Sequence, residues 1–277
     1  MGTSTEPSGL SKISAFVARP SENNQADFVY GGDLLGNLWR FKIDSVNSDT
    51  NPFLLATLKD PSGIAQAITA RPELGKISGQ TVVFIGTGKY LEESDLPPIP
   101  SPSSTTTKPR LQTQTLYAIK DGSRLISRAN LEPRSMTASG TTRTATRGDL
   151  AFTSGNGWYI DLLDNGERQV VPAKLASGTL VVPTMVPSST TCSAGGYGWL
   201  NYINAKTGGI VANPGNTLIS TMTSSSPVGI NILYIAGTPK LSYTGGQSPT
   251  PKIDPNAPFN SGSVFSGKRA SWRELIR

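Results

Sequence analysis

Apolar and polar residues alternate over short stretches bounded by Gly, Pro and Asn along most of the chain. The clearest stretch is residues 27–41, DFVYGGDLLGNLWRF. An apolar strand leads into a turn at Gly36 and Asn37, two residue types that tolerate a positive φ. The return strand alternates, so Trp39 and Phe41 share one face. This pattern predicts a β-hairpin.

Related units, each with an apolar strand, a Gly-containing turn and an aromatic-rich stretch, follow at irregular intervals. They lie at residues 81–92, 114–122, 148–162, 196–209 and 231–242. Repeated hairpins of this kind predict the blades of an all-β propeller, because each blade buries its faces on its neighbours. The repeats are degenerate, so a β-sandwich remains an alternative. Gly, Pro and β-branched residues interrupt the helical period of 3.6. We therefore expect helix only near the C-terminus.

Two polar stretches, 97–110 and 245–263, are rich in Pro, Ser and Thr and are predicted to be exposed loops. Hairpin units continue beyond the first stretch, and the tail beyond the second still carries Trp272. The stretches are therefore insertions within one domain. We predict a disordered N-terminus at 1–12, followed by one partial β-propeller domain at 13–277.

The composition supports many short strands and excludes several functions. The 277 residues include 29 Gly and 21 Pro, and charged residues make up 16%. The net charge is +6, but the basic residues cluster only at 268–277, so we expect no nucleic-acid binding. No apolar run is long enough for a membrane span, and residues 1–12 lack the pattern of a signal peptide. The single cysteine, Cys192, is expected to be a buried apolar residue.

No catalytic constellation is predicted. Histidine is absent, which removes the commonest general base and the commonest zinc ligand. The carboxylate pairs Glu92 with Glu93 and Asp161 with Asp164 are spaced as ordinary turn residues. GTGKY at 86–90 lacks the spacing of a phosphate-binding loop, so we read it as a turn that ends a strand.

Several segments together resemble a known family. They are YGGDLLGNLWRF at 30–41, ITARPEL at 68–74, VVFIGTGKYLEESDL at 82–96, QTLYAIKD at 114–121, GWYIDL at 157–162, GER at 166–168, CSAGGYGWLNYINAKTG at 192–208 and SWRELIR at 271–277. In this order they are similar to the C-terminal propeller of the PilY/PilC family of type IV pilus biogenesis and tip-associated adhesin proteins. The resemblance spans nearly the whole chain from about residue 13.

The resemblance implies a fold, a location and partners. The fold would be an incomplete set of blades from a modified seven-bladed propeller. The protein would be exported to the bacterial cell surface, outer membrane or pilus tip. It would act without catalysis in fimbrium biogenesis and cell adhesion, by contacts with pilus subunits, other assembly proteins or a host-cell receptor. The alternatives are a quinoprotein-like or glycan-active propeller enzyme, and a generic secreted binding scaffold.

The resemblance also implies a calcium loop of the form DxDxDGxxD before the hairpin at 27–41. Aligning its last position with Asp27 places Arg19, Ser21 and Asn23 at the first three ligand positions. Calcium affinity depends on the number and charge of oxygen ligands, and arginine is not a ligand. Asn23 and Asp27 remain as candidate ligands, with Glu22 beside them. We expect no cofactor, and calcium is the one candidate.

Arg147, Gly148 and Asp149 spell the integrin-binding tripeptide RGD. Gly148 and Asp149 also fit a turn before the strand that follows. The tripeptide is therefore a candidate adhesion motif whose use depends on exposure in a loop.

Overall fold

The computed structural model describes residues 2, 7–18, 22–23, 25–43, 52–97, 111–145, 152, 155–188, 195–212, 215–255 and 257–259. These residues form nineteen β-strands and two single-turn 3-10 helices, η1 (Glu93–Asp95) and η2 (Arg128–Asn130). The described part of the chain contains no α-helix. The all-β prediction is therefore confirmed.

The strands form four sheets. Sheet I has the order β1 (Ile13–Phe16), β2 (Phe28–Gly32), β3 (Asn37–Lys42), β4 (Phe53–Thr57) and β8 (Ile126–Ser127). Sheet II has the order β5 (Glu73–Ile77), β6 (Gln80–Gly86), β7 (Thr115–Lys120), β12 (Gly157–Asp161) and β9 (Glu132–Arg134). Sheet III has the order β13 (Lys174–Ala176), β14 (Thr179–Val186), β15 (Tyr197–Asn204), β16 (Leu218–Thr223), β11 (Thr142–Ala145) and β10 (Met136–Ser139). Sheet IV has the order β17 (Pro227–Ile235), β18 (Thr238–Gly245) and β19 (Ser248–Asp254).

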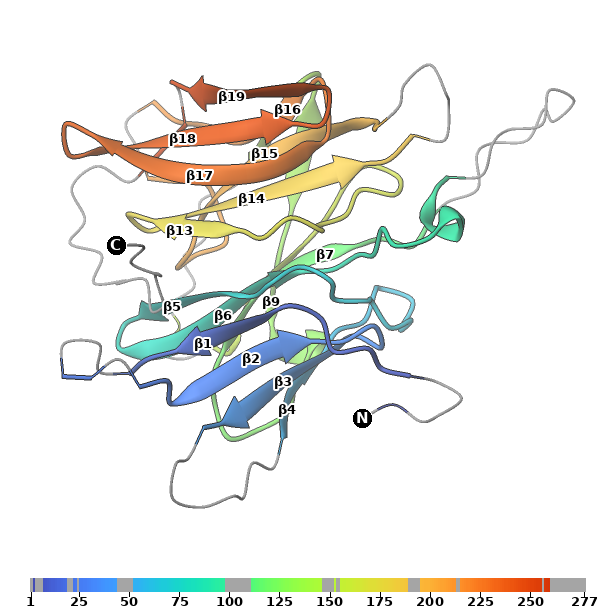
Figure 1. Cartoon of the computed structure of the whole chain (residues 1–277), viewed down its shortest axis with the longest axis vertical. Helices are drawn as coiled ribbons and strands as arrows, with labels where there is room; N and C mark the ends of the chain where they lie inside the picture. Colours follow the sequence, from blue (N-terminus) through green and yellow to red (C-terminus); the bar gives the residue numbers. More distant parts are fainter. Residues whose placement is uncertain are drawn as a thin grey trace, which may run out of the picture.

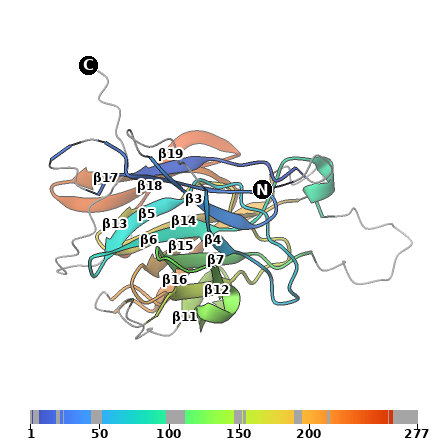
Figure 2. The ribbon, with the colours of Figure 1, turned by 90° about the horizontal axis from the view of Figure 1, so that it is seen from below.

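Each sheet is built as a propeller blade. In sheets I, II and III the first four strands run antiparallel in a meander, and sheet IV contains three strands of such a meander. The sheets stack in chain order in Figure 1, from sheet I in blue to sheet IV in orange. The first strands of the four sheets, β1, β5, β13 and β17, contact one another in sequence. The outer strands β11, β12 and β16 lie on the opposite side of the molecule (Figure 2). This arrangement is that of propeller blades around a common inner edge, and not of a sandwich.

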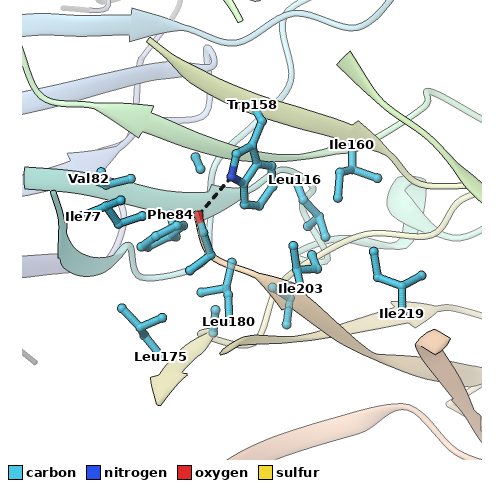
Figure 3. Close-up of a cluster of buried hydrophobic side chains, with 14 of the residues drawn as sticks. Ile77, Val82, Phe84, Leu116, Trp158, Ile160, Leu175, Leu180, Ile203 and Ile219 are labelled. Carbon is cyan, nitrogen blue, oxygen red and sulfur yellow. Dashed lines mark hydrogen bonds between the residues drawn. The ribbon is translucent and has the colours of Figure 1, made fainter. Parts of the chain in front are cut away.

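An apolar core fills each space between neighbouring sheets. Strand β6 shows how alternation builds two cores at once. Val83 and Ile85 face sheet I, and Val82 and Phe84 face sheet III. The core between sheets II and III surrounds Trp158, which donates a hydrogen bond from Nε1 to the carbonyl oxygen of Ala205 at 3.1 Å (Figure 3). A third core lies between sheets III and IV.

One connection links three sheets along their outer rim. Residues 122–145, which we call the rim segment, lie between β7 and β12 and contain four short strands. Strand β8 pairs parallel with β4 of sheet I, and β9 pairs parallel with β12 of sheet II. Strands β10 and β11 extend sheet III through β16. The rim segment therefore ties neighbouring blades together at their outer edges.

The structure also shows where the hairpin prediction needs correction. The hairpin at 27–41 is present as β2 and β3. The units at 81–92 and 114–122 are not two hairpins, because β6 pairs with β7 to make one. The unit predicted at 231–242 is present as the β17–β18 hairpin of sheet IV, but the sequence analysis missed the first turns of sheets II and III. The first turns of these three sheets are Ser78–Gly79, Ser177–Gly178 and Ala236–Gly237, and all six residues have a positive φ, as in the two-residue turns that suit a twisted hairpin.

Two predicted loop regions also differ. The stretch 245–263 contains strand β19, which pairs with β18, so residues 248–254 are not a loop. At the N-terminus, residues 7–12 lie along β2, with Ser11 N donating to Gly32 O at 2.9 Å and Leu34 N donating to Ser8 O at 2.7 Å. Main-chain bonds to a strand explain their order. Residues 98–110 and 260–277, including Trp272, lie outside the described residues.

Candidate functional site

The ends of the sheets that carry the connections β2–β3, β4–β5, β6–β7 and β12–β13 form what we call the loop end. The first of these connections is built around Asp33, which is fully buried. Its carboxylate accepts hydrogen bonds from Asn37 N at 2.8 Å and from Trp39 Nε1 at 2.9 Å. A short polar side chain that bonds its own turn in this way fixes the path of the chain. The acid of the GDLLGNLW segment therefore has a structural role.

A polar cluster at the loop end surrounds Arg143 of β11. Its side chain is fully buried and donates two hydrogen bonds to Glu167, at 2.9 and 2.8 Å. Asp164 lies 2.9 Å from the same guanidinium, which stacks 3.7 Å from the ring centroid of Trp199. A planar guanidinium suits such bidentate pairing and stacking. We call this set, with Tyr197, the Arg143 cluster.

The acids of the Arg143 cluster are also held by other donors. Thr184 Oγ1 donates to Glu167 at 2.6 Å, and Tyr197 OH donates to Asp164 at 2.9 Å. Burial raises the pKa of the Tyr197 phenol, and its bond to Asp164 raises it further. Arg143 Nε has no hydrogen-bond partner among the described residues. With both acids already bonded, the cluster is suited to fixing the β12–β13 connection rather than to proton transfer.

Two open hollows lie beside Arg168 at the loop end. The first has a volume of about 340 Å³ and is lined by residues of 111–113 and 162–166. The second has a volume of about 300 Å³ and is lined by Tyr90, Leu91, Glu92, Glu93 and Leu96. Arg168 connects the two regions, because its Nε donates to Gly166 O at 2.9 Å and its Nη1 donates to Lys89 O at 2.7 Å and to Asp95 O at 2.8 Å.

The loop at the second hollow has an ordered base and an exposed tip. Asp95 Oδ2 accepts from Leu91 N at 2.9 Å, and Lys89 Nζ lies 2.6 Å from Glu92 and 3.1 Å from Asp95. Burial of Asp95 favours its neutral form, but these donors outweigh burial and lower its pKa. Leu91 is 66% exposed and Tyr90 is 41% exposed. We call Tyr90, Leu91, Glu92 and Glu93 the loop-end patch. Two exposed apolar side chains, Tyr90 and Leu91, beside two acids on an ordered loop are suited to contacts with another protein.

The predicted calcium ligands are placed separately in the β1–β2 connection. Asp27 Oδ2 accepts a hydrogen bond from Ala18 N at 2.7 Å, and Asn23 Oδ1 accepts one from Gln25 N at 3.2 Å. Both side chains therefore stabilise the local loop. Among the described residues, no group of three or more His, Cys, Asp or Glu side chains could hold a metal ion. Arg19 and Ser21 lie outside the described residues, so the expectation of no bound calcium, with Asn23 and Asp27 as the candidate ligands, stays a prediction.

The other residues that the sequence singled out are separated or undescribed. Asp161 pairs with Arg128, and Asp164 belongs to the Arg143 cluster, so each acid has its own arginine. Arg147 to Asp149 and Cys192 lie outside the described residues. No helix in the described part of the chain is long and apolar enough to cross a membrane.

The GTGKY turn owes its glycine to close packing. Gly88 has φ +131°, and a Cβ there would lie 2.4 Å from Arg168 Cβ. Lys89 makes ion pairs with acids of its own loop. The turn is therefore structural, as we predicted.

The sequence reading missed the Arg143 cluster. Arg143 lies in TTRTATR, where nothing distinguishes it from Arg147. Glu167 and Arg168 belong to the GER segment, which carried the family resemblance without an assigned role. The signal that was present is the close spacing of Asp164 and Glu167 after a strand, since acids in a tight connection are often held by a buried base.

Comparisons with known proteins place this fold in a family. A family model described as the PilY1 beta-propeller domain matches residues 1–152. A type IV pilus biogenesis factor PilY1 homolog of Xylella fastidiosa is 32% identical over 307 residues, covering 90% of this chain and 20% of that protein. Type IV pilus biogenesis factor PilY1 of Pseudomonas aeruginosa is 30% identical over 261 residues, covering 75% of this chain and 21% of that protein.

A solved structure shows the same fold. The crystal structure of the Pseudomonas aeruginosa PilY1 C-terminal domain matches with a TM-score of 0.69 and 21% identity, covering 92% of this chain and 62% of that chain. The chain thus spans about a fifth of the length of the curated relatives it matches.

Proposed function

Because the chain belongs to the family of PilY1 β-propeller domains, we propose that it acts as a non-enzymatic scaffold in type IV pilus biogenesis. The observation that carries the proposal is the family match, together with relatives that are named as type IV pilus biogenesis factors. On this proposal the protein is exported and works at the cell surface. Its partners are pilus subunits or other pilus-assembly proteins.

The geometry supports a scaffold more than an enzyme. The buried acids at the loop end are bonded to arginines, tyrosine and main-chain donors, which leaves them poorly suited to exchange protons with a substrate. The exposed apolar side chains of the loop-end patch instead offer contact area on a fixed base. Partner contacts at this patch would be made by Leu91 and Tyr90, with the acids at the rim.

Adhesion is a finer part of the same proposal. Arg147 to Asp149 follow β11 and form the candidate receptor motif. An integrin-type contact requires the Asp149 carboxylate, and lengthening it by one methylene in Asp149→Glu displaces the charge. Unchanged attachment of host cells to bacteria carrying Asp149→Glu would argue against adhesion through this motif.

The scaffold proposal is tested in the bacterium that carries the gene. Deleting the coding region for residues 13–259 is expected to reduce surface pili, measured by immunoblot of pilin sheared from intact cells. Normal piliation in the deletion strain would contradict the proposal.

A point variant tests the loop-end patch separately. Leu91→Asp places a charge on a side chain that is 66% exposed, so the fold is expected to persist while capture of pilus proteins falls. Leu125→Asp is the matched control, because Leu125 is 49% exposed and lies in the rim segment. Equal capture of pilins by the two variants would remove the patch from the proposal without affecting the role in biogenesis.

A further inference from the structure

The two hollows at the loop end lie on either side of one buried side chain. Arg168 Nε donates to Gly166 O, in the wall of the first hollow, at 2.9 Å. Arg168 Nη1 donates to Asp95 O at 2.8 Å, directly before Leu96 in the wall of the second hollow. A planar guanidinium that is bonded on both sides has little freedom to move. The two hollows are therefore held at a short, fixed distance from each other.

The two hollows are negatively charged, whereas the chain as a whole has a net charge of +6. In the described part of the chain, the residues that line them include acids but no Lys or Arg. The acids in and directly beneath the hollows outnumber the bases, because the acids are Glu92, Glu93, Asp95, Asp164 and Glu167 and the bases are Lys89, Arg143 and Arg168. The hollows therefore attract a cation although the protein is basic.

Two of these acids are available to a partner. Glu93 is exposed, and its side chain makes no hydrogen bond or ion pair within the described part of the chain, because Lys89 pairs with other acids of the loop. The side chain of Asp164 is 22% exposed in the first hollow and shares the charge of Arg143 with Glu167. A carboxylate has about four acceptor sites, so each of these acids can take a further donor without losing a bond inside the protein.

Each hollow also offers an exposed leucine. Leu163 is 42% exposed in the first hollow, and Leu91 is exposed in the second. Lys and Arg side chains have a long aliphatic stem that packs on apolar surface while the charged head reaches a polar partner. One leucine and one acid in each hollow therefore fit a basic side chain better than a purely apolar or an acidic one.

The separation of the hollows favours an extended segment. Side chains on one side of a β-strand are two residues apart and repeat about every 7 Å. Gly166 O and Asp95 O are bonded to two nitrogens of one guanidinium, so the hollows that they border lie a comparable distance apart. A helix is about 10 Å wide and needs a continuous groove, which two separate hollows do not provide.

We propose that the two hollows together bind an extended segment of a pilus protein that carries basic side chains at positions i and i+2. One basic head pairs with Glu93 while its stem packs on Leu91, and the other pairs with Asp164 beside Leu163. The residue between them points to solvent. This inference rests on the proposed function, and it adds the chemistry of the partner to the contact surface named there.

Labelled peptides test this chemistry on the purified chain. A peptide with Lys-Thr-Lys at its centre is compared by fluorescence anisotropy with Lys-Lys-Thr, Glu-Thr-Glu and Leu-Thr-Leu peptides in the same neutral flanks at low salt. We expect the Lys-Thr-Lys peptide to bind most tightly and its affinity to fall as salt is added. Tighter binding of the acidic or the apolar peptide would overturn the proposal, as would equal binding of Lys-Thr-Lys and Lys-Lys-Thr or no binding at all.

Substitutions show whether the peptide lies in the hollows. Glu93→Lys reverses an exposed charge and is expected to weaken binding of Lys-Thr-Lys by at least about fivefold. Glu132→Lys is the matched control, because Glu132 is an exposed acid in β9 of the rim segment and its loss is expected to leave the affinity unchanged. Circular dichroism confirms that both variants are folded. An equal loss of affinity in both would overturn the site, because it would reflect net charge alone.

The first hollow is tested in the same way through its leucine. Leu163→Ser is expected to weaken binding of Lys-Thr-Lys, because the stem of one lysine loses its apolar contact. Leu125→Ser is the control, since Leu125 is similarly exposed but lies in the rim segment. Unchanged affinity in Leu163→Ser would contradict the use of two hollows.

A charge swap gives a result that a merely structural effect cannot produce. In Glu93→Lys the new charge favours a peptide in which the lysine that faced Glu93 is replaced by glutamate. We expect one of the two peptides Glu-Thr-Lys and Lys-Thr-Glu to bind Glu93→Lys more tightly than it binds the wild type, and the identity of that peptide gives the direction of the segment. No gain for either peptide would overturn the proposal.

Failure of this inference is distinguishable from failure of the role in pilus biogenesis. A deletion strain with normal pili would contradict that role, while a preference of the purified chain for Lys-Thr-Lys would still support the hollows as a site for a basic segment. Loss of pili in the deletion strain, together with no preference for Lys-Thr-Lys, would overturn this inference and leave the role in biogenesis supported.

Discussion

The Arg143 cluster allows a quantitative test, because its central ion pair is buried. In Glu167→Gln the shape of the side chain is kept, but its charge is lost and an amide donor can face the guanidinium of Arg143. Breaking a buried pair from one side costs about 3–5 kcal/mol of unfolding free energy, since the remaining charge is left uncompensated. Asp164 stays 2.9 Å from Arg143 and compensates in part. We therefore expect a loss of about 3 kcal/mol, at the lower end of that range.

The assay is unfolding in urea at neutral pH, followed by tryptophan fluorescence, with thermal unfolding as a second measure. A loss of about 3 kcal/mol corresponds to a fall in Tm of roughly 6–12 °C at about 2–4 °C per kcal/mol. Thr184→Val is the control, because it removes the hydrogen bond to Glu167 and keeps the ion pair. Asn201 Nδ2, the other partner of Thr184, keeps its bond to Val182 O, so we expect a cost of about 1 kcal/mol. The double variant Arg143→Met with Glu167→Gln removes the buried charge pair. Asp164 stays charged but is partly exposed and still accepts from Tyr197 and Trp199, so the double variant is expected to be more stable than Glu167→Gln. A Glu167→Gln protein within about 0.5 kcal/mol of wild type would refute the reasoning.

Three further predictions concern other parts of the molecule. Gly157→Ala is expected to lower the free energy of unfolding by at least about 2 kcal/mol, because Gly157 has φ +130° and an added Cβ would lie 1.8 Å from Ala118 O. Gly122→Ala is the control in the same urea assay, because a Cβ at Gly122 meets nothing within 4 Å. Burial raises the pKa of Tyr117 to about 12, above the value near 10 in the unfolded chain. The contribution of the neutral Tyr117 phenol to stability is therefore complete below pH 10 and is lost as the pH rises through 12. Phenolate absorbance that rises at the same pH in native and urea-unfolded protein would contradict this. Calcium at millimolar concentration is expected to give no heat by titration calorimetry. Asp27→Ala is expected to lower the free energy of unfolding by about 1 kcal/mol with or without calcium, because it removes the bond from Ala18 N. Binding heat that Asp27→Ala abolishes would instead establish a metal site.

The sequence predicted the parts of the fold that depend on local pattern. Alternation around Gly36 and Trp39 identified the β2–β3 hairpin, because turn chemistry and face alternation act within a few residues. The turns at Ser78 and Ser177 were missed because serine seldom takes a positive φ. Only the pairing of the flanking strands holds them there.

The site was less predictable than the fold, for a reason of distance along the chain. Arg143 and Glu167 are 24 residues apart and meet only after β11 has joined β16 across sheet III. Exposure of Leu91 likewise follows from the capped turn that Asp95 makes below it. By contrast, the hydrogen bond from Ala18 N to Asp27 joins two residues of the β1–β2 connection, the same loop in which the sequence had placed Asp27 as a candidate ligand.

The rim segment has a consequence for how the chain folds. Strand β8 completes sheet I but is synthesised after β7 of sheet II. Strand β12 of sheet II is in turn synthesised after β10 and β11, which belong to sheet III. No sheet before the fourth can be finished independently as the chain emerges from the ribosome, so the blades do not behave as separable repeats. Contacts between distant segments slow the search for the native state. A ribosome-bound chain ending near residue 121 therefore holds two incomplete sheets, each with strand edges that later residues must cover.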